Sequence, residues 1–186
     1  HSQGQGNATT YAQMVAECLG LPFAPLRFDP GDPEKVPFGR GTYAARSSLL
    51  SGAGLKMASE AIIAKCKAMA AFLMDAKDAP VNFADGVFSV EGTNRSMPIV
   101  DVAKAFFRKG GLPREFGVGL EAAGSWAAEP PNFPNVCHAI ELEVDPETGA
   151  ISVERYAAVD DCGRVINPMI CKGQIHGGIA QGLGQA

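Results

Sequence analysis

The sequence predicts an α+β fold, because helical segments and antiparallel hairpin patterns follow one another in mixed order. The strand–helix–strand rhythm that is typical of a parallel sheet is absent. The chain has 186 residues, of which 46% are hydrophobic and 19% are charged, so it can form a folded core.

The first helix is expected over residues 9–19, where apolar residues recur at helical spacing. Thr9 or Thr10 can cap its start, and a glycine directly follows its end. Residues 26–28 are compatible with a short strand. Residues 29–42 are rich in glycine and proline, so a loop is expected there.

The clearest helix is expected over residues 49–76, which are mainly small and apolar and include no proline. Gly52 and Gly54 near its start predict that another segment approaches the helix backbone closely. Residues 81–90 alternate around Asp85-Gly86, and this pattern predicts a β-hairpin with its turn at these two residues.

The second half of the chain begins with a short amphipathic helix over residues 99–108, which two glycines end. Several prolines make residues 112–135 a connector. A second hairpin is expected to pair residues 137–144 with 151–159 through an Asp-Pro-Glu-Thr-Gly turn. An Asn-Pro pair then leads into a final helix from about Met169.

The charge and hydropathy of the chain exclude several kinds of partner. The net charge of −4, without a basic patch, disfavours nucleic acid and an anionic membrane surface. No apolar run approaches the roughly 20 residues that a membrane-spanning helix needs. No signal peptide is visible, so we expect a cytoplasmic location. The sequence begins inside a glycine-rich loop and ends within a helix, and we therefore expect a partial chain.

The cysteines argue against a disulfide framework, a zinc site and an iron–sulfur cluster. There are five, an odd number, and no two stand in a Cys-x-x-Cys pair. Reduced thiols are the simpler interpretation. Cys18 and Cys66 lie on apolar helical faces, where cysteine behaves as a small hydrophobic residue.

The first segment that can carry chemistry is Gln3-Gly4-Gln5-Gly6, which leads straight into a helix. Glycines expose backbone N–H groups, the helix start adds a positive dipole end, and glutamine offers paired donor and acceptor atoms. The combination suits an anionic or amide-edged ligand. A flexible loop is the alternative, and these four residues taken alone favour it.

The second segment, Gly41-Thr-Tyr-Ala-Ala-Arg-Ser-Ser48, lies at the entrance of the long helix. Hydroxyls, an arginine and small side chains at a helix start can form a cradle for phosphate or a pterin. Ordinary N-capping by Ser47 and Ser48 is the competing interpretation.

The third segment comprises residues 160–168 and the glycine-rich stretch 173–184. Glycine costs up to about 1 kcal/mol relative to alanine in a plain helix, so these glycines indicate close packing of a backbone or a flat ligand. Gln174 and Gln181 are seven residues apart and share one face. His138 and His176 lack metal-ligand spacing, and no P-loop or nucleophile elbow is present.

Together, in this order, the three segments resemble the large subunit of the xanthine oxidase family, which includes aldehyde oxidases and carbon monoxide dehydrogenases. The matching motifs are Gln-Gly-Gln-Gly, Gly-Thr-Tyr with Arg-Ser-Ser, Glu-Leu-Glu-Val-Asp-Pro-Glu-Thr-Gly, Val-Asp-Asp-Cys-Gly with Ile-Asn-Pro, and Gly-Gln-Ile-His-Gly-Gly with Gln-Gly-Leu-Gly. They span nearly the whole chain. The form is most similar to bacterial enzymes with separate subunits that resemble carbon monoxide dehydrogenase.

The resemblance implies an α+β molybdenum-cofactor-binding domain with two partial lobes, residues 1–111 and 112–186. In that family the loops hold molybdopterin, which in bacteria is usually the cytosine dinucleotide. The cofactor-binding residues that it implies are Gln3, Gly4, Gln5, Gly6, Ala45, Arg46, Ser47, Ser48, Cys162, Asn167, Gln174 and Gln181. It implies no protein ligand to the metal, and a cofactor role rather than a nucleophilic one for Cys162.

No catalytic residue is expected in this chain. The family's catalytic glutamate lies beyond a Gln-Gly-Leu-Gly segment like the one near the C-terminus here. Glu60, Glu121 and Glu141 stand in other contexts and are not substitutes. The chain alone should therefore show no hydroxylase turnover, and we expect it to bind no molybdopterin because one side of the cradle is missing.

The parent protein is then expected to hydroxylate a heterocycle, an aldehyde or carbon monoxide, and to pass electrons to FAD and 2Fe–2S partner subunits or domains. A homodimer stays open. A non-catalytic module that binds a nucleotide or a protein is the alternative. We also expect apolar surface on the last helix, at Ile175, Ile179 and Leu183, to favour self-association or fraying.

Overall fold

The computed structural model describes residues 2–32, 34, 39, 41–76, 78–108, 110–127 and 133–186. It confirms the α+β class, with helices and antiparallel sheets in mixed order. The chain forms two compact units, residues 1–127 and 128–186. The expected division after residue 111 differs from this boundary, because Leu112, Phe116 and Leu120 pack against the core of the first unit.

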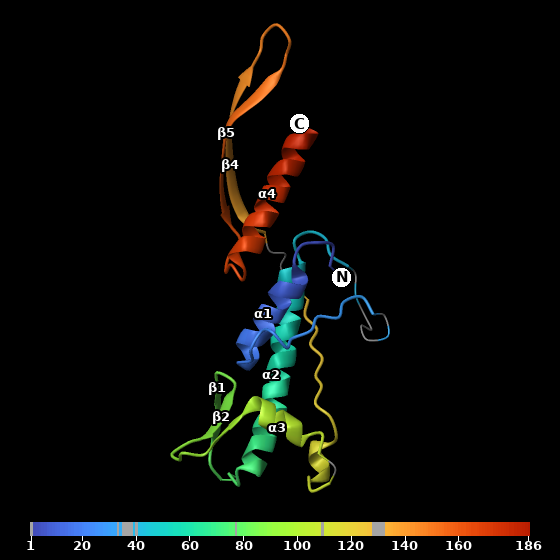
Figure 1. Ribbon diagram of the computed structural model, residues 1–186, viewed down its shortest axis with the longest axis vertical. Helices are drawn as coiled ribbons and strands as arrows, with labels where there is room; N and C mark the ends of the chain where they lie inside the picture. Colours follow the sequence, from blue (N-terminus) through green and yellow to red (C-terminus); the bar gives the residue numbers. More distant parts are fainter. Residues whose placement is uncertain are drawn as a thin grey trace. The chain divides into compact units, whose positions relative to one another are not determined.

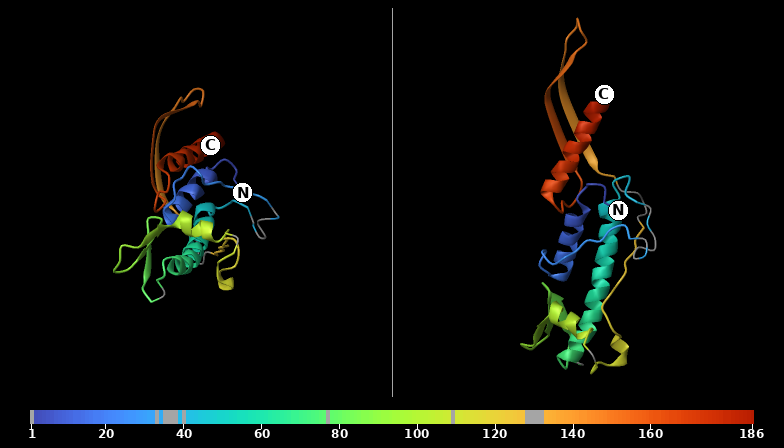
Figure 2. Two further views of the ribbon diagram at one scale, coloured as in Figure 1. Left: turned by 60° about the horizontal axis from the view of Figure 1, so that its bottom comes forward. Right: turned by 45° about the vertical axis from the view of Figure 1, so that its right-hand side comes forward.

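Two helices, α1 (Asn7–Leu19) and α2 (Ser47–Leu73), pack side by side in the first unit (Figures 1 and 2). The Tyr11 hydroxyl donates to the Ser47 carbonyl at 3.0 Å, and Met14 lies against Gly52. These contacts advance in the same direction along both helices. The helices are therefore parallel, and both begin at the same end of the unit.

The rest of the first unit is a small sheet with a short helix. Strands β1 (Val81–Ala84), β2 (Val87–Val90) and β3 (Ser96–Pro98) are antiparallel in the order β1-β2-β3, and α3 (Ile99–Ala105) follows directly. The first hairpin turns at Asp85-Gly86 as predicted, with a positive φ at both residues. The core lies between the sheet, α3 and the second half of α2, and its largest fully buried side chains are Phe88, Met69, Val90, Val102 and Cys66.

Glycine allows two close backbone approaches in this unit. A β-carbon at Gly124 would lie 2.0 Å from the Gly54 carbonyl oxygen, which confirms the close approach expected near the start of α2. The second brings the end of α1 onto the first hairpin, where a β-carbon at Gly20 would lie 2.0 Å from the Gly86 nitrogen. Both contacts therefore connect segments that are distant in the sequence.

The caps and bounds of several expected elements are wrong. Thr9 and Thr10 lie inside α1, and both donate their N–H groups to Gly6, which is the N-cap with a φ of 79°. No strand forms at residues 26–28, where the Phe28 ring packs edge-on against Tyr11. Strand β3 was not expected, because three residues ending in proline give no alternating pattern.

Three other expectations differ in their bounds. Helix α2 runs from 47 to 73 rather than 49–76, and an Arg95 guanidinium nitrogen donates to the Met74 carbonyl at 2.6 Å just beyond its end. Helix α3 stops at 105 rather than 108, since residues 106–108 form tighter three-residue turns. The expected loop 29–42 has no regular structure where it is described, and residues 33, 35–38 and 40 lie outside the described residues.

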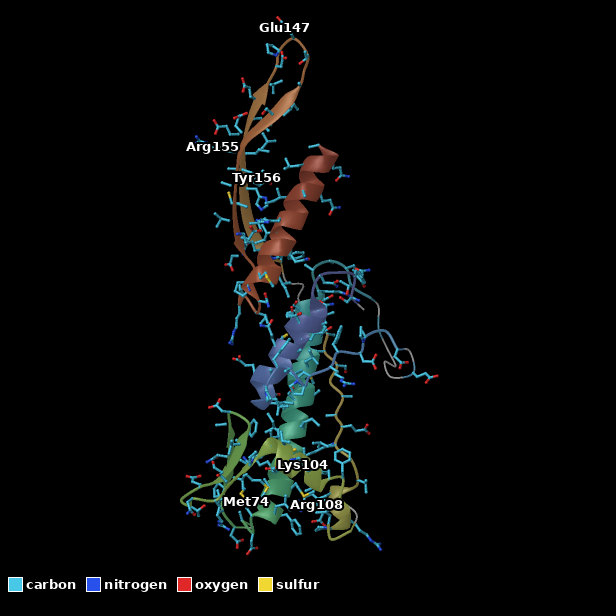
Figure 3. All side chains as sticks on the ribbon, viewed as in Figure 1. Met74, Lys104, Arg108, Glu147, Arg155 and Tyr156 are labelled. Atoms are coloured by element: carbon cyan, nitrogen blue, oxygen red, sulfur yellow. The ribbon has the colours of Figure 1, made fainter. Side chains whose placement is uncertain are left out.

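The second unit holds the predicted hairpin and final helix. Strands β4 (Asn135–Val144) and β5 (Ile151–Asp161) pair with one bulge, and α4 (Pro168–Gln185) follows. Glu147 lies at the tip of the hairpin (Figure 3). The turn is stabilised by Asp145, whose carboxylate accepts from the Thr148 hydroxyl at 2.7 Å and the Glu147 N–H at 2.8 Å, and these bonds lower its pKa.

The second unit has no buried core of its own, since none of the described residues 133–186 is buried. Helix α4 leans on one face of the hairpin, with an open cleft between them. The cleft is lined by Tyr156, Ala158, Asp160, Lys172, Ile175, His176 and Ile179. Among the described residues, no helix is long and apolar enough to cross a membrane.

Candidate cofactor site

The parallel packing of α1 and α2 brings two predicted segments to one end of the first unit. Residues 2–7 precede and open α1, and residues 41–48 precede and open α2. We call this end the N-terminal edge. Figure 1 shows both loops there. The edge therefore brings together the Gln-Gly-Gln-Gly segment and the Gly-Thr-Tyr to Ser-Ser segment. These two segments contain eight of the twelve predicted cofactor-binding residues.

Both helices reach this edge without a side-chain cap. The first-turn N–H groups of a helix have no intrahelical acceptor, and serine or threonine normally supplies one. Here the N-cap residues are Gly6 and Arg46. Capping by Ser47 and Ser48 is therefore wrong: Ser47 is the first helical residue and donates its hydroxyl to Thr42 at 2.8 Å. Two positive helix ends thus meet an edge that holds no acidic side chain.

Gln5 carries an unmet hydrogen-bonding group. Its Nε2 atom is buried and has no hydrogen-bond partner among the described residues, whereas its Oε1 accepts from the Gln3 N–H at 2.5 Å. An unpartnered buried donor costs about 1–3 kcal/mol, so its retention indicates a ligand that supplies the acceptor. Gly4 has a φ of 101° and open space where a β-carbon would stand, so its backbone is accessible from that side.

The loop before α2 is held by its own arginine. The Arg46 guanidinium lies 3.8 Å from the centre of the Tyr43 ring and donates to the Gly41 carbonyl at 2.9 Å. Ala44 and Ala45, between them, have φ values of 50° and 52°. Left-handed alanine costs about 1–2 kcal/mol per residue and is typical of functional loops. The loop is therefore fixed in a strained form that presents small side chains.

These features fit a flat ligand with phosphate groups. Helix starts and exposed backbone N–H groups bind anions, an arginine adds fixed positive charge, and an amide such as that of Gln5 matches the donor and acceptor edge of a pterin. Molybdopterin has both parts. The donors present are thus chemically suited to it.

The four remaining predicted residues lie in the second unit. Asn167 caps α4, because its side-chain oxygen accepts from the Ile170 N–H at 3.0 Å. Cys162 follows β5, is exposed and lies with its sulfur 3.5 Å from that of Cys171. Gln174 and Gln181 are exposed on α4. Asn167 therefore has a structural role in addition to any contact with a ligand.

The other singled-out polar residues are not part of the two loops that form the N-terminal edge. His138 is on β4, with Nδ1 2.9 Å from the Tyr156 hydroxyl and Nε2 3.6 Å from Asp160. His176 is exposed on α4. The carboxylates that we set aside as catalytic substitutes are exposed at Glu60, Glu121 and Glu141.

Sequence reasoning missed three residues that build the edge. Asn7 is buried at the first position of α1. Tyr11 connects the two helices through Ser47, and Tyr43 holds Arg46. Tyr43 stood inside a quoted motif and Tyr11 in the first predicted helix, but no local pattern shows which ring contacts which other residue.

Comparisons with known proteins identify a family and relatives that match the whole chain. The family described as "Molybdopterin cofactor-binding domain" matches residues 1–186. The nicotine 6-hydroxylase large subunit of Paenarthrobacter nicotinovorans is 40% identical, over 99% of this chain and 23% of that protein. The carbon monoxide dehydrogenase large chain of Hydrogenophaga pseudoflava is 36% identical, over 100% of this chain and 23% of that protein. The chain thus spans less than a quarter of the length of these relatives.

Solved structures agree with the fold. The CO dehydrogenase from Oligotropha carboxidovorans superposes with a TM-score of 0.86 at 34% identity, over 96% of this chain and 22% of that one. The quinoline 2-oxidoreductase from Pseudomonas putida 86 gives a TM-score of 0.84 at 35% identity, over 100% of this chain and 24% of that one. With its motifs in order and its whole length matched, this chain belongs to the molybdopterin cofactor-binding domain family.

Proposed function

We propose that this chain is part of the molybdopterin-binding subunit of a molybdenum hydroxylase, which oxidises a heterocycle, an aldehyde or carbon monoxide with water as the oxygen source. The relatives named above are a nicotine hydroxylase and carbon monoxide dehydrogenases, and a quinoline oxidoreductase shares the fold. When bound, the cofactor supplies the two-electron redox chemistry that such a hydroxylation requires.

The observation that carries this proposal is the N-terminal edge, where two uncapped helix starts meet beside the unpartnered amide of Gln5. A phosphate-bearing pterin would satisfy all of these donors together. The residues that we propose to hold it are Gln3, Gly4, Gln5, Gly6, Ala45, Arg46, Ser47, Ser48, Cys162, Asn167, Gln174 and Gln181.

Each group has a distinct task in this proposal. The N–H groups at the two helix starts and the Arg46 guanidinium bind negative charge. The Gln5 amide donates to an acceptor on the pterin edge and so orients it. The contacts of Tyr43 and Tyr11 hold these groups in place before the cofactor arrives, which reduces the ordering cost of binding.

We further propose that the cofactor is molybdopterin cytosine dinucleotide and that FAD and 2Fe–2S clusters on other subunits or domains carry the electrons onward. The cysteines of this chain support this division of labour, since they offer no cluster-binding pattern. The proposed setting is the cytoplasm, with a small molecule as the substrate. The catalytic carboxylate is proposed to lie on a segment of the parent subunit outside this chain.

The test is metal and pterin analysis of the complete subunit, purified with its partner subunits. We expect stoichiometric molybdenum and, after oxidation, a fluorescent pterin with cytosine nucleotide. Gln5→Leu in that subunit should lower the pterin content several-fold, whereas the control Gln185→Leu, on the exposed end of α4, should not. A complete complex without molybdenum would overturn the proposal in favour of a non-catalytic binding module.

A further inference from the structure

Two thiols approach each other where β5 leads into α4. The Cys162 and Cys171 sulfur atoms are 3.5 Å apart, although nine residues separate them in the chain. A disulfide needs about 2.05 Å between its sulfurs, so a small side-chain movement would close the gap. Cys162 is exposed and Cys171 is half-buried, so solvent-borne reagents can reach the pair.

We propose that Cys162 and Cys171 form a redox-sensitive pair, which a peroxide or a small-molecule disulfide converts reversibly into an intramolecular disulfide. The proposal does not rest on the cofactor function proposed above, and it concerns the chain without cofactor, since Cys162 is also one of the residues proposed to hold that group. It follows from the distance between the sulfurs, their exposure and the short loop that connects them.

The two cysteines have different tasks in this reaction. The exposed Cys162 sulfur attacks one oxygen of hydrogen peroxide, the O–O bond breaks, and a sulfenic acid and hydroxide form. The Cys171 sulfur then attacks the Cys162 sulfur, and hydroxide leaves from the sulfenic acid. The thiol protons neutralise the two hydroxides, so two thiols and one peroxide yield one disulfide and two waters.

The surroundings of Cys171 favour Cys162 as the sulfur that reacts first. The hydrogen bond with Cys162 is the largest cause that raises the pKa of Cys171, and partial burial and nearby negative charge add to it. Because the thiolate is the nucleophilic form, the raised pKa makes Cys171 the less reactive of the two sulfurs toward peroxide, and in the second step its proton must leave as its sulfur attacks that of Cys162. Its hydrogen bond meanwhile holds the two sulfurs in contact.

The disulfide would connect the exit of the hairpin to the first turn of α4. The closed loop spans residues 162–171 and includes the Asn167 cap. Closing this loop removes conformational freedom from the unfolded chain, which favours the folded arrangement of the loop. Oxidation should therefore stabilise the start of α4.

The other cysteines provide internal controls. Cys66 is buried in the core of the first unit, and Cys18 is half-buried on α1. Cys137 is exposed on β4, and the structure records no sulfur contact for it. Cys137 therefore tests whether exposure alone causes oxidation.

The experiment treats the reduced 186-residue chain with a slight excess of hydrogen peroxide, blocks the remaining thiols with iodoacetamide and maps tryptic peptides by mass spectrometry. Arg164 provides a cleavage site between the two cysteines, so a disulfide joins two separate peptides. We expect Cys162 and Cys171 to disappear together as one cross-linked species, restored by dithiothreitol, while Cys137 stays alkylated. Cys137→Ser should leave the cross-link intact, and Cys171→Ser should abolish it.

A second measurement keeps the test independent of the serine variants. Phenylarsine oxide bridges neighbouring thiols, so it should protect Cys162 and Cys171 from alkylation together. Hydrogen exchange of the Ile170 and Cys171 amides should slow on oxidation. Independent alkylation of the two cysteines, or a cross-link between Cys162 and Cys137 instead, would overturn the proposal.

Discussion

The amide nitrogen of the Gln5 side chain makes no hydrogen bond that would stabilise the described fold. Its Nε2 atom is buried without a partner, whereas the neighbouring polar side chain of Thr10 donates to the Gly6 carbonyl at 3.2 Å. Polar groups that serve the fold are paired, because an unpaired one is costly. A residue of this kind is expected where binding determines the choice of side chain.

The substitution Gln5→Leu should therefore change the free energy of unfolding of the 186-residue chain by less than about 1 kcal/mol, since removal of the unsatisfied donor offsets loss of the exposed hydrogen bond from the Gln3 N–H. Denaturant unfolding followed by circular dichroism measures this. Thr10→Val is the matched control and should cost roughly 1 kcal/mol, because its hydroxyl has an acceptor. A Gln5→Leu loss as large as that of Thr10→Val would show that the amide supports the fold.

Cys66 predicts a dependence of stability on pH. Its burial raises the pKa of the thiol from 9.0 to about 11. Between pH 9 and 11 the native state keeps a proton that the unfolded state releases. The free energy of unfolding therefore has its full value below pH 9 and falls as the pH rises toward 11. At about 1.4 kcal/mol per pKa unit, the free energy of unfolding should fall by roughly 1–3 kcal/mol.

Unfolding measured from pH 8 to 11 on the parent and on Cys66→Ala checks this. The free energy of unfolding of the parent should exceed that of Cys66→Ala by less and less across that range, because alanine has no proton to lose. The variant Cys137→Ala controls for thiol loss at an exposed position. A difference in free energy of unfolding that stays constant to pH 11 would contradict the prediction.

Elements of the first unit contact one another where a side chain would not fit. At Gly20 the end of α1 has a φ of 60°, and a β-carbon would lie 2.0 Å from the Gly86 nitrogen. Gly92, in the turn after β2, has a similar φ of 72° but no atom within 4 Å of that position. The two glycines thus separate the cost of the backbone conformation from the cost of the contact.

Gly92→Ala should cost about 1–2 kcal/mol, which is the penalty for left-handed alanine. Gly20→Ala should cost at least about 2 kcal/mol more, because α1 and the β1–β2 turn must also move apart. Thermal or denaturant unfolding of both variants provides the comparison. Equal losses would mean that the close approach of α1 to the hairpin adds nothing to stability.

The whole molecule combines one unit with a core and one without. The buried hydrophobic residues belong to the first unit, and large apolar side chains such as Ile140, Leu142, Val153 and Leu183 are exposed in the second. Contiguous exposed apolar surface is unusual on a stable monomer. The chain spans 23% of the relatives it matches, and segments outside that share are candidates to cover this surface.

We therefore expect the isolated chain either to self-associate through the second unit or to show fast hydrogen exchange in α4. Light scattering over a concentration series, together with hydrogen exchange resolved by residue, measures both. Leu183→Gln should weaken any association, whereas Gln185→Leu should not. A monomer at all concentrations with a fully protected α4 would show that the second unit is stable by itself.

Features that depend on residues close together in the chain could be predicted from the sequence alone. Asp85-Gly86 and the turn from Asp145 to Gly149 fold as predicted, because a two- to five-residue turn needs only its own dihedrals and hydrogen bonds. The spacing of apolar residues likewise predicted the helices. Their ends differ from the prediction where a group distant in the sequence, such as Arg95, bonds to the backbone near a helix end. The ordered motifs predicted the family, which the comparisons show.

Which of these segments contact one another depends on the folded arrangement of the whole chain. The parallel packing of α1 on α2 brings Gln5 and Arg46 to one edge, and no local pattern encodes the direction in which two helices pack. The approach of Gly54 to Gly124 depends in the same way on how the chain returns. Such contacts arise from burial and steric fit between segments that are far apart in sequence, and a pattern read within one segment does not contain the shape of the other.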